Sequence, residues 1–195
     1  MSMLLNDKKV GFAITGSFCT FKAVIPEIKK LLEQSKEVVP IMSFNAYNTD
    51  TRFGKAQDFI DEIELICNKK IIHTIEEAEP IGPQGLTDIM IIAPCTGNTL
   101  AKLANGITDT PVLMAAKSHL RNGNSLVIGV STNDGLSNNL KNIGILMNIK
   151  NIYFIPFRQD NPITKPTSLV FDVKSIVGTL EKALEKEQTQ PLLLG

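Results

Sequence analysis

Short apolar runs alternate along this chain with stretches in which apolar residues recur every three or four positions. The apolar runs lie at residues 10–14, 37–42, 71–72 and 89–93, and helical spacing follows the first of them. Continuous apolar runs are typical of strands buried on both faces, and strands that alternate with helices pair in parallel. The pattern predicts an α/β fold, built on a mostly parallel six-stranded sheet with helices on both faces.

The remaining predicted elements fit the same domain. Further strands are expected at residues 112–115 and 126–130 with a short late one at 152–155, and helices at 53–67, 99–105, 136–146 and 172–186. The break rich in proline and glycine at residues 80–85 lies inside the alternation, which makes it a loop and not a linker. We expect one domain over residues 1–195, with an ordered core at 8–187 and a frayed tail at 188–195 whose leucines are available to a neighbouring subunit.

Composition excludes several classes of protein. Twenty basic residues balance twenty acidic ones, so the chain lacks the positive field that attracts nucleic acids or anionic membranes. Its three cysteines are widely spaced and form no CxxC pair, which argues against disulfides and against a metal site. No run approaches the length of a membrane span or of a signal peptide. We expect a soluble cytoplasmic protein that binds no metal, nucleic acid or membrane.

Small polar residues follow three of the predicted strands. Thr15, Gly16 and Ser17 come after the first, Ser43 after the second, and residues 94–99 after the strand at 89–93. The carboxyl ends of parallel strands meet at one edge of a sheet, where ligands bind and where the first amides of a helix lack partners. We therefore expect a ligand site at this edge.

The type of ligand is indicated by what these turns lack. The first turn does not have GxGxxG spacing, and strand two ends in Ser43 where dinucleotide-binding folds place a carboxylate for the ribose. A hydroxyl suits a phosphate better, so Thr15, Gly16, Ser17 and Ser43 are predicted to form a cup for a monophosphate. The alternative is that Ser17 only caps its helix and that Ser43 only ends a strand.

The third turn and its continuation carry a specific resemblance. They are similar to the PASANT-type signature of the homo-oligomeric flavin-containing cysteine decarboxylase family, and the likeness runs over most of residues 8–155. The matching residues are Pro94, Asn98, Thr99, Ala101, Lys102, Ala104, Gly106 and Asp109. The resemblance implies a three-layer, Rossmann-like flavoprotein fold, FMN or a related flavin as cofactor, and assembly based on trimers.

The same resemblance implies roles for single residues. Thr15, Gly16 and Ser17 would form the phosphate turn, and the hydroxyl of Ser43 would contact the phosphate. The signature turn would lie against the flavin ring, which assigns cofactor contacts to Pro94, Thr96, Gly97, Asn98 and Thr99. Asn98 would also face the reacting ligand, which makes it the first catalytic candidate, and Gly97 would let the turn approach a flat ring closely.

Two elements of the decarboxylating members are missing. Those members carry a base-like histidine shortly before the strand that leads to the signature, where this chain has acidic residues at 76–79. They also carry an MN-containing substrate clamp, where residues 114–121 here contain neither that pair nor a similar one. Decarboxylation needs a clamped, desolvated carboxylate, so these losses argue against that chemistry and spare the flavin cup.

The segments that replace these elements are rich in cations. Lys117, His119 and Arg121, with Arg158 and Lys165 later in the chain, would suit a ligand that bears carboxylates, and Lys117 is a second catalytic candidate. The alternative is a solvated charged face, with His119 as a helix cap or an ordinary surface residue.

One branch of the family, from spore-forming bacteria, resembles this chain in the carboxyl-terminal segment at 157–170 and in the missing histidine. That resemblance implies aromatisation of a dihydropyridine dicarboxylate together with a second polypeptide that is similar to an NADP-binding protein. Two alternatives stay open, namely a flavin-dependent decarboxylase with an altered clamp and a non-catalytic module that stabilises or regulates its partner.

Overall fold

The computed structural model describes residues 4–195, which form a seven-stranded sheet in the order β2-β1-β3-β4-β7-β6, with β5 also paired to β4. The strands are β1 (Lys9–Ile14), β2 (Glu37–Met42), β3 (Ile89–Cys95), β4 (Ser125–Thr132), β5 (Ile152–Phe154), β6 (Phe157–Asn161) and β7 (Lys165–Phe171). Strands β1 to β5 pair in parallel, and β6 and β7 form an antiparallel hairpin that joins the end of β4. The predicted α/β class is confirmed, with seven strands and not six.

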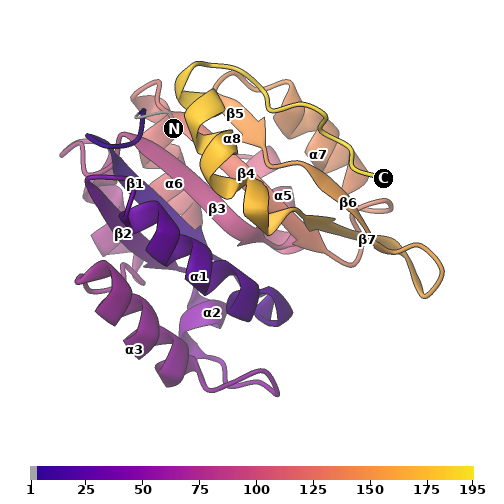
Figure 1. The fold of residues 1–195 in the computed structure, drawn as a ribbon, viewed down its shortest axis with the longest axis horizontal. Coiled ribbons are helices and arrows are strands. Elements are labelled where there is room, and N and C mark those ends of the chain that lie inside the picture. The colour runs from indigo at the N-terminus through magenta and orange to yellow at the C-terminus, as the bar shows by residue number, and fades with distance from the viewer. Residues whose placement is uncertain (1–3) are drawn as a thin grey trace.

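Helices cover both faces of the sheet. Helices α1 and α8 lie on one face and α5, α6 and α7 on the other, while α3 packs against α1 and β2 (Figure 1). The longer helices are α1 (Phe21–Leu32), α3 (Ala56–Cys67), α5 (Gly97–Ala104), α6 (Pro111–Arg121), α7 (Leu140–Met147) and α8 (Ile176–Leu184). Short turns of helix are α2 (Phe44–Asn48), α4 (Ile75–Ala78) and the 3₁₀ segments η1 (Phe18–Thr20), η2 (Glu79–Ile81) and η3 (Val173–Ser175).

The strand predicted at residues 112–115 is wrong, because these residues lie inside α6. Thr110 caps this helix by accepting a hydrogen bond from the Leu113 N–H at 3.3 Å, and Pro111 occupies its first turn. Both are helix start signals. Val112, Leu113, Ala115 and Ala116 are all buried, and periodicity alone does not separate a short buried helix from a buried strand.

Smaller differences concern the ends of elements. Residues 71–72 form no strand and contribute one isolated bridge, between Ile41 and Ile72. Helix α3 begins at Ala56 and not at residue 53, and α7 begins at Leu140 and not at 136. The predicted loop at residues 80–85 lies within the domain and includes the end of η2.

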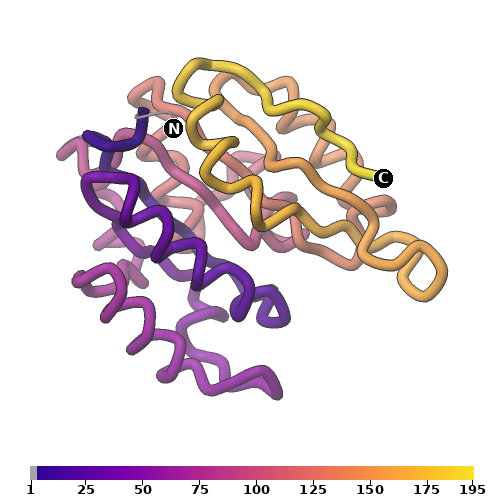
Figure 2. The backbone as a smooth tube through the Cα atoms, in the orientation of Figure 1, coloured from indigo at the N-terminus to yellow at the C-terminus, as the bar shows by residue number. Residues whose placement is uncertain are grey.

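The tail at residues 188–195 follows a defined path beside β5 and β6 and is not frayed (Figure 2). The side chain of Gln188 pairs with the backbone of Phe154, accepting from its N–H at 2.8 Å and donating to its carbonyl oxygen at 2.7 Å. Further along, Leu192 accepts from the Phe157 N–H and Leu194 donates to the Phe157 carbonyl oxygen, both at 3.0 Å. The tail thereby covers an edge that the sheet would otherwise leave open.

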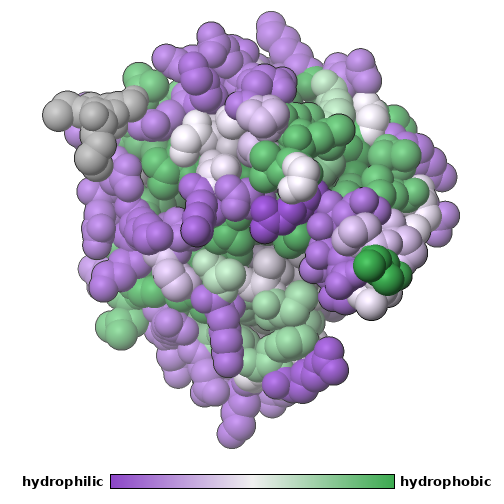
Figure 3. Space-filling model, turned by 45° about the vertical axis from the view of Figure 1, so that its right-hand side comes forward, coloured by the Kyte–Doolittle hydropathy of each residue, from purple (hydrophilic) through white to green (hydrophobic). Residues whose placement is uncertain are grey.

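Figure 3 shows one face, on which apolar residues gather in patches between polar ones. Over residues 4–195, no helix is both long enough and apolar enough to cross a bilayer.

Candidate ligand site at the carboxyl edge of the sheet

Residues from all three predicted turns line one cavity of about 480 Å³, which we call the turn cavity. Its lining includes Thr15 and Gly16 after β1, Ser43 after β2, and Thr96, Asn98 and Thr99 after β3. A second cavity of about 660 Å³ adjoins it and shares Gly16, Phe18 and Thr96. We call it the hairpin cavity, because Asp160 and Lys165 of the β6–β7 hairpin belong to its lining. The three turns therefore meet at one edge of the sheet.

Thr15 joins the first and third turns. Its hydroxyl donates to the carbonyl oxygen of Pro94 at 2.8 Å and accepts from the N–H of Thr96 at 2.9 Å. Thr15 is buried, and Pro94 is buried as the last part of β3. Both residues fix the relative position of the turns, and the Thr15 hydroxyl already has its protein partners.

The hydroxyls of Ser43 and Thr96 cap the helices that follow them. Ser43 Oγ accepts from the N–H of Ala46 at 3.3 Å, and Thr96 Oγ1 accepts from the N–H of Thr99 at 3.4 Å. Capping uses only the acceptor side of a hydroxyl, so the Ser43 proton stays available to a ligand. The alternative that Ser43 only ends its strand is therefore incomplete.

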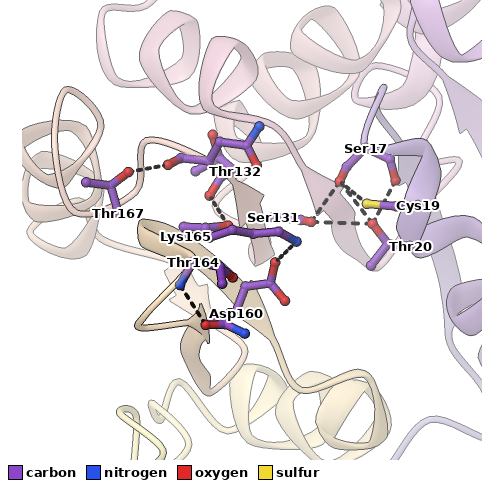
Figure 4. Close-up of polar contacts among 12 residues, drawn as sticks. Ser17, Cys19, Thr20, Ser131, Thr132, Asp160, Thr164, Lys165 and Thr167 are labelled. Atoms are coloured by element: carbon purple, nitrogen blue, oxygen red, sulfur yellow. Dashed lines mark hydrogen bonds and ion pairs between the residues drawn. The ribbon is translucent and has the colours of Figure 1, made fainter.

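Ser17 lines the hairpin cavity and not the turn cavity. Its side chain makes no cap hydrogen bond, so the alternative that it caps its helix is wrong. Ser17 Oγ instead lies 2.8 Å from Ser131 Oγ, and the Thr20 hydroxyl donates to the Ser17 carbonyl oxygen at 2.7 Å (Figure 4). These three residues bring polar groups from η1 and β4 to one wall of the cavity.

Gly97 has a different role from the one its position in the signature implies. A Cβ atom there would overlap with Asn139 Nδ2 and would lie 2.5 Å from Thr132 Oγ1 and 2.6 Å from Asp134 Oδ1. Gly97 also does not line the turn cavity. The glycine is required by packing against this polar cluster, and not by the approach of a flat ring.

Asn98 is exposed at the start of α5 and lines the turn cavity. Among residues 4–195 its side-chain amide has no hydrogen-bond partner, although Asn105, Asn139 and Asn142 all use theirs. Its amide is therefore able to donate to a ligand and to accept from one.

Helix α6 carries three of the predicted substrate residues away from the site. Thr110, at its start, lines the turn cavity, but the helix runs back toward the opposite edge of the sheet. His119 is buried there, with Nδ1 2.8 Å from Thr87 Oγ1 and Nε2 2.9 Å from the Ser125 carbonyl oxygen. Burial lowers the pKa of His119, which favours the neutral imidazole.

Of the five predicted substrate residues, only Lys165 lines a cavity. Lys117 and Arg121 are on α6, and Arg158 is exposed on β6 outside both linings. The Nζ atom of Lys165 lies 2.5 Å from Asp160 Oδ2, and this hydrogen bond raises the pKa of Lys165. The structure therefore does not bring the five cations together in one cavity.

Two residues of the site were missed in the sequence. Ser131 stands at the carboxyl end of β4, so the rule that ligands bind at this edge would have found it. Arg52, between α2 and α3, lines the hairpin cavity from a segment without any recognisable motif.

Comparisons with known proteins agree with this architecture. The family model "Flavoprotein" matches residues 2–180. The B subunit of dipicolinate synthase from Bacillus subtilis (strain 168) is 47% identical over 190 residues, which cover 97% of this chain and 95% of that protein.

Solved structures show the same relationship. The crystal structure of the dipicolinate synthase B subunit from Bacillus halodurans superposes with a TM-score of 0.90 at 46% identity, covering 98% of both chains. The FMN-dependent cysteine decarboxylase SpaF shares the fold, with a TM-score of 0.67 at 18% identity over 95% of this chain and 99% of that one. The family model covers most of the chain, and a relative is 47% identical over nearly its whole length. The chain therefore belongs to the flavoprotein family.

Proposed function

We propose that this chain is the B subunit of a dipicolinate synthase, which acts with the A subunit of that enzyme to convert dihydrodipicolinate to dipicolinate during sporulation, and that it holds FMN in the turn cavity. The observation that carries the proposal is the convergence of Thr15, Ser43 and Asn98 on that cavity. The relative at 47% identity supports the same assignment.

The turn cavity has the features that FMN requires. Its volume of about 480 Å³ lies within the range of about 300–1,000 Å³ found for small-molecule sites. Ser43 offers a hydroxyl proton for the phosphate, and the first amides of α5 have no partner inside the helix. Phe18 and Phe44 contribute aromatic rings to the lining, which suits a flat ring system.

Gly16 supports the same assignment. It lines both cavities, and a Cβ atom there would meet Phe18 at 3.5 Å and Asn45 at 3.6 Å, which are ordinary contacts. Packing within the protein therefore does not require a glycine at this position. Close approach of a ligand to the backbone does explain it.

Aromatisation of a dihydropyridine removes two electrons and two protons. A bound flavin would accept the two electrons. Turnover would then need a second acceptor, of the nicotinamide or dioxygen class, to reoxidise the flavin. NADP enters this scheme only through the A subunit. Asn98 lines the turn cavity, so its side-chain amide would orient the flavin ring on the side of the reacting ligand. We assign no catalytic role to Lys117, because it lines neither cavity.

We also propose a trimer-based homo-oligomer in the cytoplasm. Leu140, Ile145 and Met147 on α7 are 51%, 46% and 40% exposed, which supports burial against another copy. Cys19, Cys67 and Cys95 are all free thiols, as expected in a reducing compartment.

An anaerobic single-turnover experiment tests the proposed function. The protein is loaded with FMN and mixed with dihydrodipicolinate, with and without the A subunit, and the flavin absorption bands are followed. We expect bleaching of these bands and one dipicolinate for each flavin reduced. Release of carbon dioxide would establish the decarboxylase alternative, and dipicolinate formation without any bleaching would establish the non-catalytic partner.

A further inference from the structure

We propose that the hairpin cavity binds a planar dicarboxylate between Arg52 and Lys165, and that Asp160 competes with this ligand for Lys165. The inference deepens the proposed function, on which it rests for the class of substrate, and it places that substrate beside the turn cavity.

The two cations reach the hairpin cavity from different elements. Arg52 belongs to the segment between α2 and α3, and Lys165 is the first residue of β7. The Arg52 guanidinium lies 5.0 Å from the centroid of the Phe53 ring, and no carboxylate of the described residues lies within 4.0 Å of it. Its planar set of donors is therefore open to a carboxylate, which it suits in a two-point arrangement.

The rest of the lining suits a flat polar ring. The hydroxyls of Ser17, Thr20 and Ser131 form one hydrogen-bonded group on the wall, with Thr20 Oγ1 3.0 Å from Ser17 Oγ and 3.4 Å from Ser131 Oγ. Thr20 and Ser131 are only 8% and 7% exposed. Phe18 and Phe53 add aromatic rings to the lining, so an aromatic ring and its carboxylates find complementary groups in the same cavity.

Asp160 already offers Lys165 a carboxylate. Figure 4 shows the Lys165 side chain extending from the hairpin, with its Nζ atom next to the Asp160 carboxylate. The side chains of Lys165 and Asp160 are 58% and 38% exposed, and an ion pair in solvent is exchanged for another one at little cost. A ligand carboxylate that pairs with Lys165 either displaces Asp160 or shares the ammonium with it, and in both cases the negative charge of Asp160 opposes binding of the ligand.

If Asp160 competes with the ligand, removing a cation and removing the Asp160 charge should change the affinity for the dicarboxylate in opposite directions. Removing either cation weakens binding of the dicarboxylate, whereas removing the Asp160 charge strengthens it. A purely structural hairpin pair predicts the contrary, because Asp160→Asn and Lys165→Gln would then disturb the hairpin in the same way.

Calorimetric titration of the full chain with dipicolinate measures these effects. We expect Arg52→Gln and Lys165→Gln to raise the dissociation constant at least tenfold, and Asp160→Asn to lower it about threefold. Lys182→Gln is the matched control, since Lys182 also forms ion pairs but lies on α8 outside both cavities, and we expect no change there. Pyridine-2-carboxylate, with one carboxylate, should bind at least tenfold more weakly than dipicolinate.

A second measurement uses Cys19, an exposed free thiol in the lining of the hairpin cavity. Dipicolinate should slow alkylation of Cys19 in the wild type and have no effect in Arg52→Gln. Retention of FMN is measured on the same samples, which separates the two proposals.

Loss of affinity in Asp160→Asn, or FMN retention without dipicolinate binding, would overturn the inference and leave the flavin site standing. If the protein retains no FMN but binds dipicolinate, and the three variants change the dissociation constant as expected, the inference would be supported and the flavin site contradicted.

Discussion

The Thr15 hydroxyl donates to the Pro94 carbonyl oxygen at 2.8 Å and thereby ties together two turns that are 79 residues apart. The same oxygen accepts from the Thr96 N–H, so one buried side chain sets the spacing between the ends of β1 and β3. The shape of the turn cavity depends on this contact, because both turns contribute to its lining.

Thr15→Val should therefore weaken both fold and site. The substitution keeps the volume but leaves the Thr96 N–H without its acceptor, which costs about 1–3 kcal/mol. We expect a lower melting temperature and weaker FMN binding, measured by thermal denaturation and by flavin fluorescence. Thr15→Ser keeps the hydroxyl and should lie close to wild type. A valine variant as stable as wild type would contradict this role for Thr15.

Gly16 and Gly97, which belong to two of the three turns, should respond differently to substitution. A Cβ atom at Gly16 would meet only ordinary contacts in the protein, so we expect Gly16→Val to fold and to lose FMN binding at least tenfold. Gly97→Ala places a methyl group within 2.6 Å of three polar atoms, so it should lower the free energy of unfolding by about 1–3 kcal/mol. Urea denaturation and FMN titration of both variants measure the two effects. Equal FMN affinity in Gly16→Val and wild type would show that no ligand approaches this turn.

Stability should fall in mild acid because of His119. Burial holds the pKa of His119 below its ordinary value of 6.5. In the folded state the neutral ring donates from Nε2 to the Ser125 carbonyl oxygen, and Nδ1 accepts a hydrogen bond from the Thr87 hydroxyl. The unfolded chain binds the proton first as pH falls, so stability is complete above about pH 6.5 and declines below it by at most about 1.4 kcal/mol per pH unit. Denaturant titrations between about pH 5 and pH 7.5 should show this slope, and His119→Phe should reduce it. An unchanged slope in that variant would assign the acid sensitivity to other groups.

Substitutions at Asn98 and Ser43 distinguish a catalytic subunit from a non-catalytic one. Neither Asn98→Ala nor Ser43→Ala removes a buried apolar contact, so both should fold, and we expect Asn98→Ala to lower the reconstituted activity about a hundredfold. Ser43→Ala should raise the FMN concentration needed for half-maximal activity. Full activity in both variants at limiting FMN would favour the non-catalytic alternative.

The sequence was sufficient to predict the sheet and the edge where the site lies. Buried parallel strands have a strong signal, and Thr15, Ser43 and Asn98 each follow one, so their convergence was predictable from topology alone. Strands β6 and β7 were both missed, because β6, apart from Phe157, is exposed and lacks an apolar run, and β7 begins with exposed residues.

The predicted positions of the substrate residues on α6 were wrong for a related reason. Taking residues 112–115 as a strand placed Lys117 and His119 just beyond its carboxyl end, at the ligand edge. In a helix that starts at that edge, a rise of about 1.5 Å per residue moves His119 toward the opposite edge. Arg52 could not be predicted from the sequence, because a cation in a loop belongs to no periodic sequence pattern. Its position depends on how α2 and α3 pack.

The proposal that the turn cavity holds the phosphate of a flavin at Ser43 is decided by titrating the protein with FMN and following flavin fluorescence. We predict saturable binding by wild type, at least tenfold weaker binding by Ser43→Asp because its carboxylate repels the phosphate, and no change in Ser137→Asp, whose side chain is exposed outside both cavities. Equal FMN affinities of wild type and Ser43→Asp, or no saturable binding by wild type, would contradict it.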